Sequence, residues 1–520
     1  MYCIDFNGVI HNVAQDIIRK AQSVTTATPA PTTATTVNDI IESEIITGVW
    51  ERIKYYIENY KADKYIICAD GVAPLAKMFQ QRKRRYLNIY KYTLDNVSIK
   101  WDTNAITPGT LFMEKLNTYI YENITQPQYS SKVIYSGSNE CGEGEHKIFR
   151  IIRESVATGA SRIIIHGLDA DLIILSLMSH KENIYLMREV KDPHTNNTVY
   201  NYLNINELRK AILCELKIKW DLSDSGNSGD SSDLCDNDVI ETYCTACSIL
   251  GNDFIPHLLT IELKNNGIET LMSATKKSIK TNGLLVNSGV INHNCLIDIL
   301  KDLAHTEDED IHSICERYIK RRPPDNRNTG ANTGANTGAN VASDYYGLKN
   351  KDPLINTIYN SPNKWRQEYY RVIFDNNISI DSTVMFNACN NYIKGIYWVY
   401  SYYKGAPIDC EWYYPYNYPP TIKDILNHSI ANEAPVLNCD NEFVPAYIQL
   451  LIVLPKYSYK LLSKKHQRYM LDIYGGLFHM YPVKYNIQTF LKTQLWECSP
   501  VLPLINLNYM KRVFELESKY

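Results

Sequence analysis

Short apolar segments alternate with amphipathic segments in the first half of the chain, and this alternation constrains the fold more than any other feature. Continuous apolar runs of this length are typical of strands buried on both faces of a parallel sheet. Five such runs are YCIDF (2–6), KYIICAD (64–70), KVIYSG (132–137), RIIIHGLD (162–169) and NIYLMREV (183–190). Between the first two, residues 39–60 repeat apolar side chains at near-helical spacing. The pattern predicts an α/β fold, a doubly wound and mostly parallel sheet flanked by helices.

Seven acidic residues stand at the carboxyl ends of apolar segments or in the turns just after them. They are Asp5, Asp70, Glu143, Glu145, Asp169, Asp171 and Asp253. Because ligands of doubly wound sheets gather at the carboxyl ends of the strands, we expect these side chains to converge. Crowded carboxylates repel one another unless cations sit among them, and such hard oxygen ligands suit Mg²⁺ or Mn²⁺. The set predicts a two-metal site for phosphodiester cleavage.

Each acid taken singly also has a structural explanation. Glu143 and Glu145 precede an apolar helical pattern, so they would complement the dipole at a helix N-terminus. Asp169 and Asp171 would serve as a capping pair after the strand RIIIHG. The glycines of GEGEH favour the ligand role, because they let backbone and ligand approach closely. Seven acids in similar settings together indicate a metal site.

The segment DGVAPLAKMFQQRKRRY (70–86) predicts a helix with one polar, mostly basic face. Pro74 is suited to the first helical turn. Lys77, Gln81, Arg84 and Arg85 follow at i, i+4, i+7 and i+8, so they share one face. An ammonium, an amide and two guanidinium groups there form a pocket for a terminal phosphate. A solvated basic face is the alternative, and the nearby candidate ligand Asp70 favours the phosphate pocket.

Three further aromatic side chains are candidates for contacts with a base. His11 follows Asp5 by six residues, and a core histidine is the plainer interpretation of it. Trp398 and Trp412 lie in the aromatic segments YWVYSYYKG and EWYYPYNYPP. Their indole faces would suit stacking on the bases of a single strand, whereas core packing is the default for both.

Composition limits the classes of protein that remain. The chain has 520 residues, 45% of them hydrophobic, and a net charge of −3, which gives a large core, more than one domain and no global basic field. No apolar run is long enough for a membrane span, and no signal peptide is visible. Thirteen irregularly spaced cysteines are typical of reduced thiols in an intracellular protein. The sequence lacks the Walker, Rossmann, GxSxG and HExxH motifs of other enzyme classes.

Low-complexity segments divide the chain. Residues 25–36 and 223–238 read as disordered inserts, because their composition buries too little apolar surface to offset chain entropy. The repeat NTGANTGANTGAN (328–340) lies in a predicted linker, residues 323–343. We therefore predict an α/β domain over 1–322 and a mostly helical second region over 344–520, packed against the first.

Several sequence blocks carry a resemblance to a known family. In the first half they are FNGVIHN, DGVAPLAKMFQQRKRRY, SGSNECGEGEHKI, HGLDADLIILSL and GNDFIPHL. In the second half they are WRQEYYRVIF, YIKGIYWVYSYYKGAPIDCEWYYPYNYPP, QLLIVLPKYS and LWECSPVLPLI. With these blocks the chain resembles the Xrn family of 5′→3′ exoribonucleases over nearly its whole length, the three low-complexity segments excepted.

The resemblance implies a PIN/flap-nuclease-like fold and a specific reaction. The seven acids would hold divalent metal, Mg²⁺ or Mn²⁺, as two ions. Lys77, Gln81, Arg84 and Arg85 would bind the 5′-monophosphate of single-stranded RNA, and His11 with Trp398 or Trp412 would stack on a base. The products would be nucleoside 5′-monophosphates. The location would be the cytoplasm or nucleus, or the host cytoplasm for a viral protein, with no membrane association.

The chain also departs from the family pattern. From the resemblance we expect it to lack the segment that usually precedes the first catalytic strand and the long C-terminal region of the large cytoplasmic members. Cys141 stands where the family usually has proline. One alternative is a structure-specific flap endonuclease acting on DNA, although the residues after GNDF lack its glycine-rich hairpin. Another is a non-catalytic protein that binds RNA 5′ ends, which the complete set of acids disfavours.

Overall fold

The computed structural model describes residues 1–23, 37–97, 99–155, 161–167, 169–192, 195, 197–216, 235–324, 344–375 and 383–517. The predicted insert 25–36 and the repeat 328–340 lie outside these residues, as does most of the predicted insert 223–238. The last three residues of that insert are wrongly predicted, because α9 (Asp236–Cys247) begins there. Asp236 and Asp238 occupy its first turn, where carboxylates are favoured by the helix dipole.

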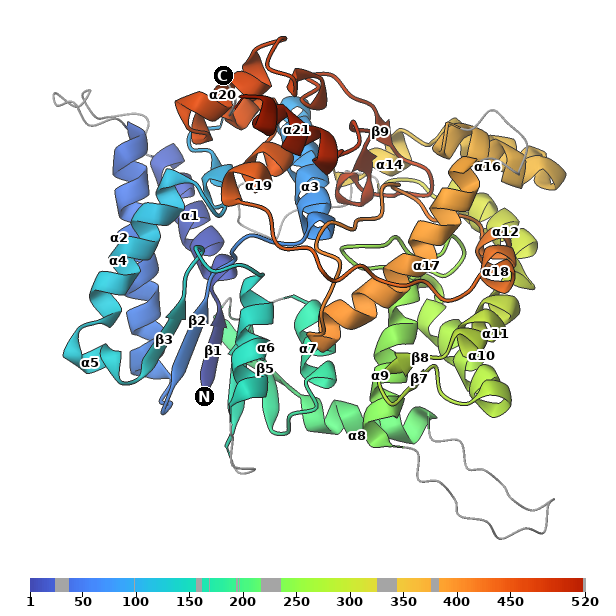
Figure 1. The fold of residues 1–520 in the computed structure, drawn as a ribbon, viewed down its shortest axis with the longest axis horizontal. Helices are drawn as coiled ribbons and strands as arrows, with labels where there is room; N and C mark the ends of the chain where they lie inside the picture. Colours follow the sequence, from blue (N-terminus) through green and yellow to red (C-terminus); the bar gives the residue numbers. More distant parts are fainter. Residues whose placement is uncertain are drawn as a thin grey trace, which may run out of the picture.

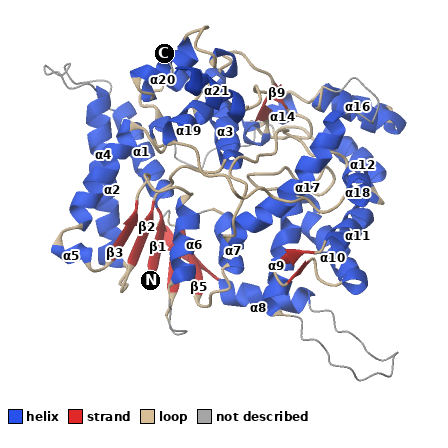
Figure 2. Cartoon of the chain, in the orientation of Figure 1, coloured by secondary structure: helices blue, strands red, loops and turns tan. Residues whose placement is uncertain are grey.

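A six-stranded sheet forms the centre of the first part of the chain (Figure 2). Its strands lie in the order β3-β2-β1-β4-β5-β6, and all adjacent pairs are parallel except β5 with β6. The five predicted strands are confirmed, and β6 is an additional antiparallel strand at the edge. The bounds are β1 Tyr2–Asp5, β2 Tyr65–Cys68, β3 Val133–Ser136, β4 Ile163–His166, β5 Ile184–Lys191 and β6 Thr198–Asn204.

Both faces of the sheet are buried, as the continuous apolar strands require. Tyr2 and Ile4 of β1 pack with α1, α2 and α4, whereas Cys3 between them packs with α6 and α7 on the other face. Figure 1 shows α1, α2 and α4 grouped on one side of the sheet. The helices of this part are α1 Phe6–Ser23, α2 Val37–Asn59, α3 Leu75–Leu94, α4 Leu111–Ile124, α5 Pro127–Ser130, α6 Gly144–Glu154, α7 Asp171–Met178 and α8 Ile205–Leu216.

The rest of the chain is mostly helical and packs against the sheet layer. One continuous core lies between the sheet face that carries α6 and α7 and the helices of this region. These helices include α9 and the long α17. The prediction of a mostly parallel sheet flanked by helices, with a helical region packed against it, is confirmed. In the described residues, no helix has the length and apolarity to cross a membrane.

The later helices follow α9 along the chain. They are α10 Gly267–Asn282, α11 His293–Ala304, α12 Glu307–Lys320, α14 Tyr346–Lys349, α15 Pro353–Asn360, α16 Trp365–Ile373, α17 Thr383–Lys404, α18 Ile422–Ala431, α19 Ala446–Val453, α20 Lys464–Leu471 and α21 Leu507–Glu517. Two short antiparallel pairs are β7 Val286–Asn287 with β8 Val290–Ile291, and β9 Ile487–Gln488 with β10 Ser499–Pro500. The predicted division at residue 322 stays a prediction.

Helix α3 is held between the sheet domain and the C-terminal helices (Figure 1). Its apolar side chains, among them Leu75 and Met78, form a core with α19, α20 and α21. The fully buried Arg82 fixes the same contact, since its guanidinium donates to the carbonyl oxygens of Ile452 (3.2 Å) and Met480. Pro74 is the residue before the first helical turn rather than within it. The basic face of α3 is thus carried on a rigidly packed helix.

Candidate active site

The seven predicted acids converge at the carboxyl ends of the parallel strands. Asp5 ends β1, and Asp70 and Asp169 follow β2 and β4. The other four come from the start of α6, from the start of α7 and from the loop after residues 248–250. Mutual electrostatic interactions connect all seven carboxylates. The convergence expected from the strand positions is therefore present in the structure.

Glycine at position 144 makes the approach of α6 to β2 possible. A Cβ atom there would lie 2.6 Å from the carbonyl oxygen of Cys68 and 3.4 Å from Oδ1 of Asp70. The Gly144 N–H donates to that Oδ1 at 2.7 Å. Asn7 holds the other side of the same carboxylate, since its Nδ2 donates to Oδ2 of Asp70 at 2.6 Å. Asp70 is thus oriented by two partners from separate elements.

Burial and mutual repulsion raise the pKa of most of the carboxyl groups. Burial, followed by the charges of Asp70 and Asp169, raises the pKa of Asp5 to about 8. Burial is also the main cause that raises the pKa of Glu143 and that of Asp171 to about 6. The exposed Asp169 lies at the edge of the cluster. Carboxylates that are costly to ionise in this arrangement would be stabilised by a bound cation.

Lys77 supplies a positive charge inside the cluster. Its Nζ lies 2.6 Å from Oε2 of Glu143 and 2.8 Å from Oδ2 of Asp253. These carboxylates hold the pKa of Lys77 well above its usual value, although burial acts in the opposite direction. Lys77 likewise keeps the pKa of Asp253 below its usual value despite the burial of that carboxyl. The sequence grouped Lys77 with the phosphate-binding side chains, and in the structure it contacts two of the acids.

The donor set is suited to a divalent cation. Glu143, Glu145 and His146 each present one possible ligand atom, and these atoms all lie within 4.8 Å of one another. Oε2 of Glu145 and Nε2 of His146 are buried and have no hydrogen-bond partner in the described part of the chain. Buried polar atoms of this kind call for a ligand or an ion. The oxygen-rich composition fits Mg²⁺ or Mn²⁺.

Sequence reasoning missed two tyrosines that the helical region contributes. The Tyr402 hydroxyl, from α17, donates to Oε1 of Glu143, and the Tyr403 hydroxyl is hydrogen-bonded to Asp171. The ring of Tyr402 also lies against His146, with centroids 3.8 Å apart. Both tyrosines are buried. Their segment was singled out for its aromatic content, but no local signal links it to the acids.

The predicted phosphate-binding face of α3 leads away from the acids. Gln81 is buried and Arg84 is exposed. Nη2 of Arg85 donates to Oγ1 of Thr107 at 2.7 Å. Oε1 of Gln81 and Nη1 of Arg85 are buried without a hydrogen-bond partner among the described residues. His11, on α1, lies near enough to this face to feel its charges. Burial, and then the charges of Arg84 and Arg85, lower the pKa of His11 to about 4. His11 is therefore neutral near pH 7.

Both candidate tryptophans lie in the protein core. Trp398 is fully buried and its Nε1 donates to the carbonyl oxygen of Asp409 at 2.8 Å. Trp412 is 5% exposed, with its ring centroid 5.1 Å from that of Trp398. Neither presents a free face to a base in this structure. The default interpretation of core packing describes both, and stacking on a base stays a prediction only for the half-buried His11.

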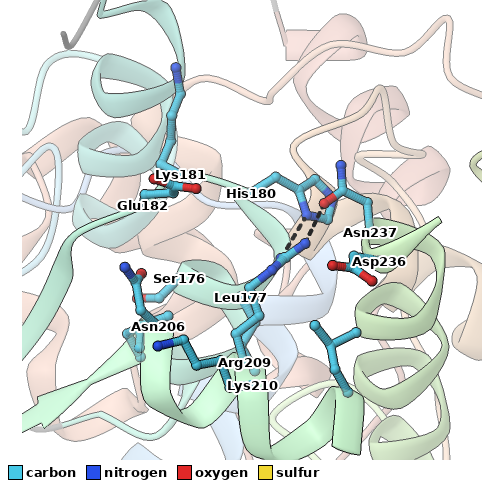
Figure 3. Close-up of a pocket in the computed structure, with 12 residues that line it drawn as sticks. Ser176, Leu177, His180, Lys181, Glu182, Asn206, Arg209, Lys210, Asp236 and Asn237 are labelled. Carbon is cyan, nitrogen blue, oxygen red and sulfur yellow. Dashed lines mark hydrogen bonds between the residues drawn. The ribbon is translucent and has the colours of Figure 1, made fainter. Parts of the chain in front are cut away.

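A separate cavity of about 300 Å³ lies among α7, α8 and α9 (Figure 3). Arg209 is hydrogen-bonded to two other residues that line it. Nη2 of Arg209 donates to Oδ1 of Asn237 at 2.5 Å, and Nη1 lies 3.5 Å from Nδ1 of His180. Nε2 of His180 in turn lies 2.7 Å from Oε1 of Glu241. The network ties the three helices together, and none of the seven acids lines the cavity.

Comparison with known proteins gives matches along most of the chain. Residues 1–190 match the family model described as "XRN 5'-3' exonuclease N-terminus". Residues 235–353 and 349–518 match the model described as "Xrn1 helical domain". The first stretch contains six of the seven acids, and the second contains Asp253, Tyr402 and Tyr403.

Curated relatives are similar over much the same range. Human 5'-3' exoribonuclease 1 is 26% identical, over 90% of this chain and 30% of the relative. The Schizosaccharomyces pombe 5'-3' exoribonuclease 1 is 24% identical, over 97% of this chain and 45% of the relative. The Drosophila melanogaster 5'-3' exoribonuclease 2 homolog is 24% identical, over 98% of this chain and 64% of the relative. The chain spans less than two thirds of each of these relatives. With both family models matched in order, it belongs to the Xrn family.

Proposed function

We propose that this protein is a 5′→3′ exoribonuclease that depends on Mg²⁺ or Mn²⁺ and degrades 5′-monophosphorylated RNA to nucleoside 5′-monophosphates. The observation that carries the proposal is the juxtaposition of two sites on one rigid helix. Lys77 of α3 lies among the converged acids, and the arginines further along the same helix face lie beside His11. The names of the curated relatives agree with this activity.

The acids would hold two divalent ions. Glu143, Glu145, Asp171 and Asp253 are grouped on the α6 and α7 side, with Asp5, Asp70 and Asp169 at the strand ends. Bound there, the metal would supply electrostatic stabilisation for attack by water at phosphorus. The protein's own groups would orient the site: Asn7 holds Asp70, Tyr402 holds Glu143 and Tyr403 holds Asp171.

The α3 face would recognise the terminal phosphate. Arg84 and Arg85 would donate charge-assisted hydrogen bonds to it. The rise of an α-helix puts the backbone of Arg84 about 10 Å from that of Lys77, so a bound 5′ end determines which phosphodiester reaches the acids. The buried atoms of Gln81 and Arg85 that have no partner among the described residues point to a ligand in this position. A pocket built for one phosphate accommodates a triphosphate or a cap poorly.

The test is digestion of one RNA sequence with four different ends. In Mg²⁺ we expect rapid release of nucleoside 5′-monophosphates from the 5′-monophosphate form. Release from the 5′-triphosphate and 5′-hydroxyl forms should be slow, and a circular form should stay intact. Equal rates on all linear forms would remove end recognition from the proposal. Cleavage of the circle would favour the flap-type endonuclease, and RNA binding without any release would favour a non-catalytic 5′-end binder.

A further inference from the structure

A cavity of about 1070 Å³ adjoins the acid cluster on the side of Asp253. Its walls are the loop that follows Asp253, the C-terminal end of α12 and the segment between β9 and β10, with Lys83 entering from α3. It is roomier than most small-molecule pockets, which run to about 1,000 Å³. The family resemblance assigns a role to Asp253 and none to the other residues that line this cavity.

The lining of the cavity carries an excess of positive charge. Three carboxylates face it, namely Asp253, Glu262 and Glu497. The cations that line it are Lys83, Lys264, Arg317, Lys320, Arg321 and Lys492. The whole protein has a net charge of −3, so this excess is local. A concave surface lined by cations concentrates anionic ligands.

Four of these six cations form no ion pair with a described residue, and Lys83 and Lys492 are the two of them whose charges act on each other. Neither Lys83 nor Lys492 forms an ion pair or hydrogen bond with another described residue, and each instead lies over an aromatic ring. Nζ of Lys83 is 4.5 Å from the centroid of Phe79, and Nζ of Lys492 is 5.4 Å from that of Tyr418. The two ammonium groups repel each other, while Asp253 also acts on Lys83, and Glu262 and Glu497 act on Lys492. Two partly buried, neighbouring ammonium groups make a site for an anion between them.

Trp496 adds an aromatic surface at the same cavity. Its side chain is 68% exposed, in contrast to the buried Trp398 and Trp412. Nζ of Lys264 lies 5.4 Å from the Trp496 ring, leaving most of the indole open to solvent. Proteins that bind single-stranded nucleic acids present exposed aromatic rings beside basic surfaces, and the bases stack on these rings.

We propose that this cavity is a second nucleotide-binding site, in which Lys83 and Lys492 bind a phosphate group and Trp496 stacks on a base. The proposal rests on the proposed function, because that reaction supplies the nucleotide. The nucleotide is either part of the RNA strand beyond the cleaved bond or the released nucleoside 5′-monophosphate. Both carry the same phosphate and base. The site differs from the α3 pocket, which is formed by Gln81, Arg84 and Arg85 on another face of the helix.

The test measures binding by the full chain in EDTA, so that no turnover is needed. The probes are adenosine 5′-monophosphate and a 5′-hydroxyl hexauridylate, which has no terminal phosphate for the α3 pocket. The variants are Lys492→Gln and Trp496→Ala, each also made with Arg84→Ala. Lys456→Gln is the matched control, since Lys456 lies over the ring of Phe478 at 4.2 Å and does not line the cavity.

We expect Lys492→Gln and Trp496→Ala each to weaken binding of at least one probe by about tenfold, and Trp496→Phe to restore part of the loss. The loss should persist with Arg84→Ala, and Lys456→Gln should have no effect. A loss confined to the hexauridylate identifies the strand as the source, and a loss for adenosine 5′-monophosphate identifies the product.

Unchanged binding of both probes in folded Lys492→Gln and Trp496→Ala variants overturns the proposal. Because Trp496 is exposed, the Trp496→Ala variant should unfold at the same temperature as the unmodified protein. If Lys492→Gln fails to fold, Trp496→Ala still tests the proposal. The measurement is independent of turnover. Absence of exonuclease activity in the unmodified protein would therefore overturn the proposed function without deciding whether the second nucleotide-binding site exists.

Discussion

The ammonium of Lys77 lies 2.6 Å from a carboxylate oxygen of Glu143, and both side chains are largely buried. The same ammonium contacts Asp253. A lysine therefore occupies the space among carboxylates that are expected to bind metal. Breaking a buried ion pair by removing one partner leaves the other charge uncompensated. The pair thus offers a direct way to measure how the cluster is stabilised without metal.

Lys77→Gln should destabilise the metal-free protein and enlarge the stabilisation that Mn²⁺ provides. Loss of a buried ion-pair partner costs roughly 3–5 kcal/mol, and the freed carboxylates should then gain more from a cation. Thermal unfolding at about pH 8 with EDTA or MnCl₂ measures both effects. Lys54→Gln is the control, because Lys54 pairs with the exposed Glu51 at the protein surface. An unchanged unfolding temperature for Lys77→Gln in EDTA would contradict the buried pair.

Asp171→Ala should abolish Mg²⁺-dependent nucleotide release without destabilising the metal-free fold. Burial and the charge of Asp253 raise the pKa of Asp171 to about 6, so its removal relieves repulsion. We expect the unfolding temperature in EDTA to stay the same or rise. Asp169→Ala should also abolish turnover, with little change in stability because Asp169 is exposed. Near-normal release by either variant would exclude that residue from the metal site.

The metal-free protein should lose stability as the pH rises from about 6.5 to about 8. In this range Asp5, with a pKa of about 8, keeps a proton in the folded state that the unfolded chain has already released. Histidines such as His11, with a pKa lowered to about 4, oppose this effect only at lower pH, where the unfolded histidines are charged. The free energy of unfolding therefore falls with increasing pH. Denaturant unfolding in EDTA at several pH values measures the slope.

Asp5→Asn identifies the source of that slope. It should flatten the decrease above about pH 6.5, where Asp5 still titrates. Mn²⁺ should reverse the decrease, because an ion bound among the ionised carboxylates would stabilise the folded state. Stability that rises over this interval in EDTA would show that the carboxyl group of Asp5 is not held at a raised pKa.

Arg84→Ala should impair cleavage of 5′-phosphorylated RNA much more than that of 5′-hydroxyl RNA. The variant removes a charge-assisted contact of order 1.5–3 kcal/mol from the terminal phosphate. The 5′-hydroxyl substrate would not engage the proposed pocket, so we expect its cleavage to change little. Single-turnover rates on both substrates separate the two cases. A similar decrease on both would mean that Arg84 acts only through general attraction to the backbone.

Tyr402→Phe should reduce turnover and metal affinity through Glu143. The variant removes the hydroxyl that donates to this buried carboxylate, a contact of order 1.5–3 kcal/mol. Mn²⁺ titration should show weaker binding, while the affinity for 5′-phosphorylated RNA in EDTA should not change. Tyr474→Phe is the control, with its side chain 89% exposed. Unaltered Mn²⁺ affinity in Tyr402→Phe would mean that the hydroxyl does not orient a ligand.

Much of the sheet could be predicted from the sequence because its central strands are buried on both faces. The continuous apolar runs that end at Asp5 and near Asp70 leave few other possibilities. Strand β6 was missed because polar and apolar residues alternate in TVYNYLN and its edge position leaves Tyr202 exposed. The first turn of α9 was missed because acidic residues that favour a helix N-terminus also resemble a disordered insert.

The sequence by itself determined that the acids meet and that one face of α3 is mostly basic. Both depend on short-range periodicity: parallel strands end at one edge of the sheet, and helical spacing groups residues on one face. Only the tertiary structure decided that Lys77 lies within the acids, that Trp398 is buried and that Tyr402 reaches Glu143. That last pair is separated by 259 residues. Such contacts depend on how α17 packs against the sheet domain, and no local pattern encodes that packing.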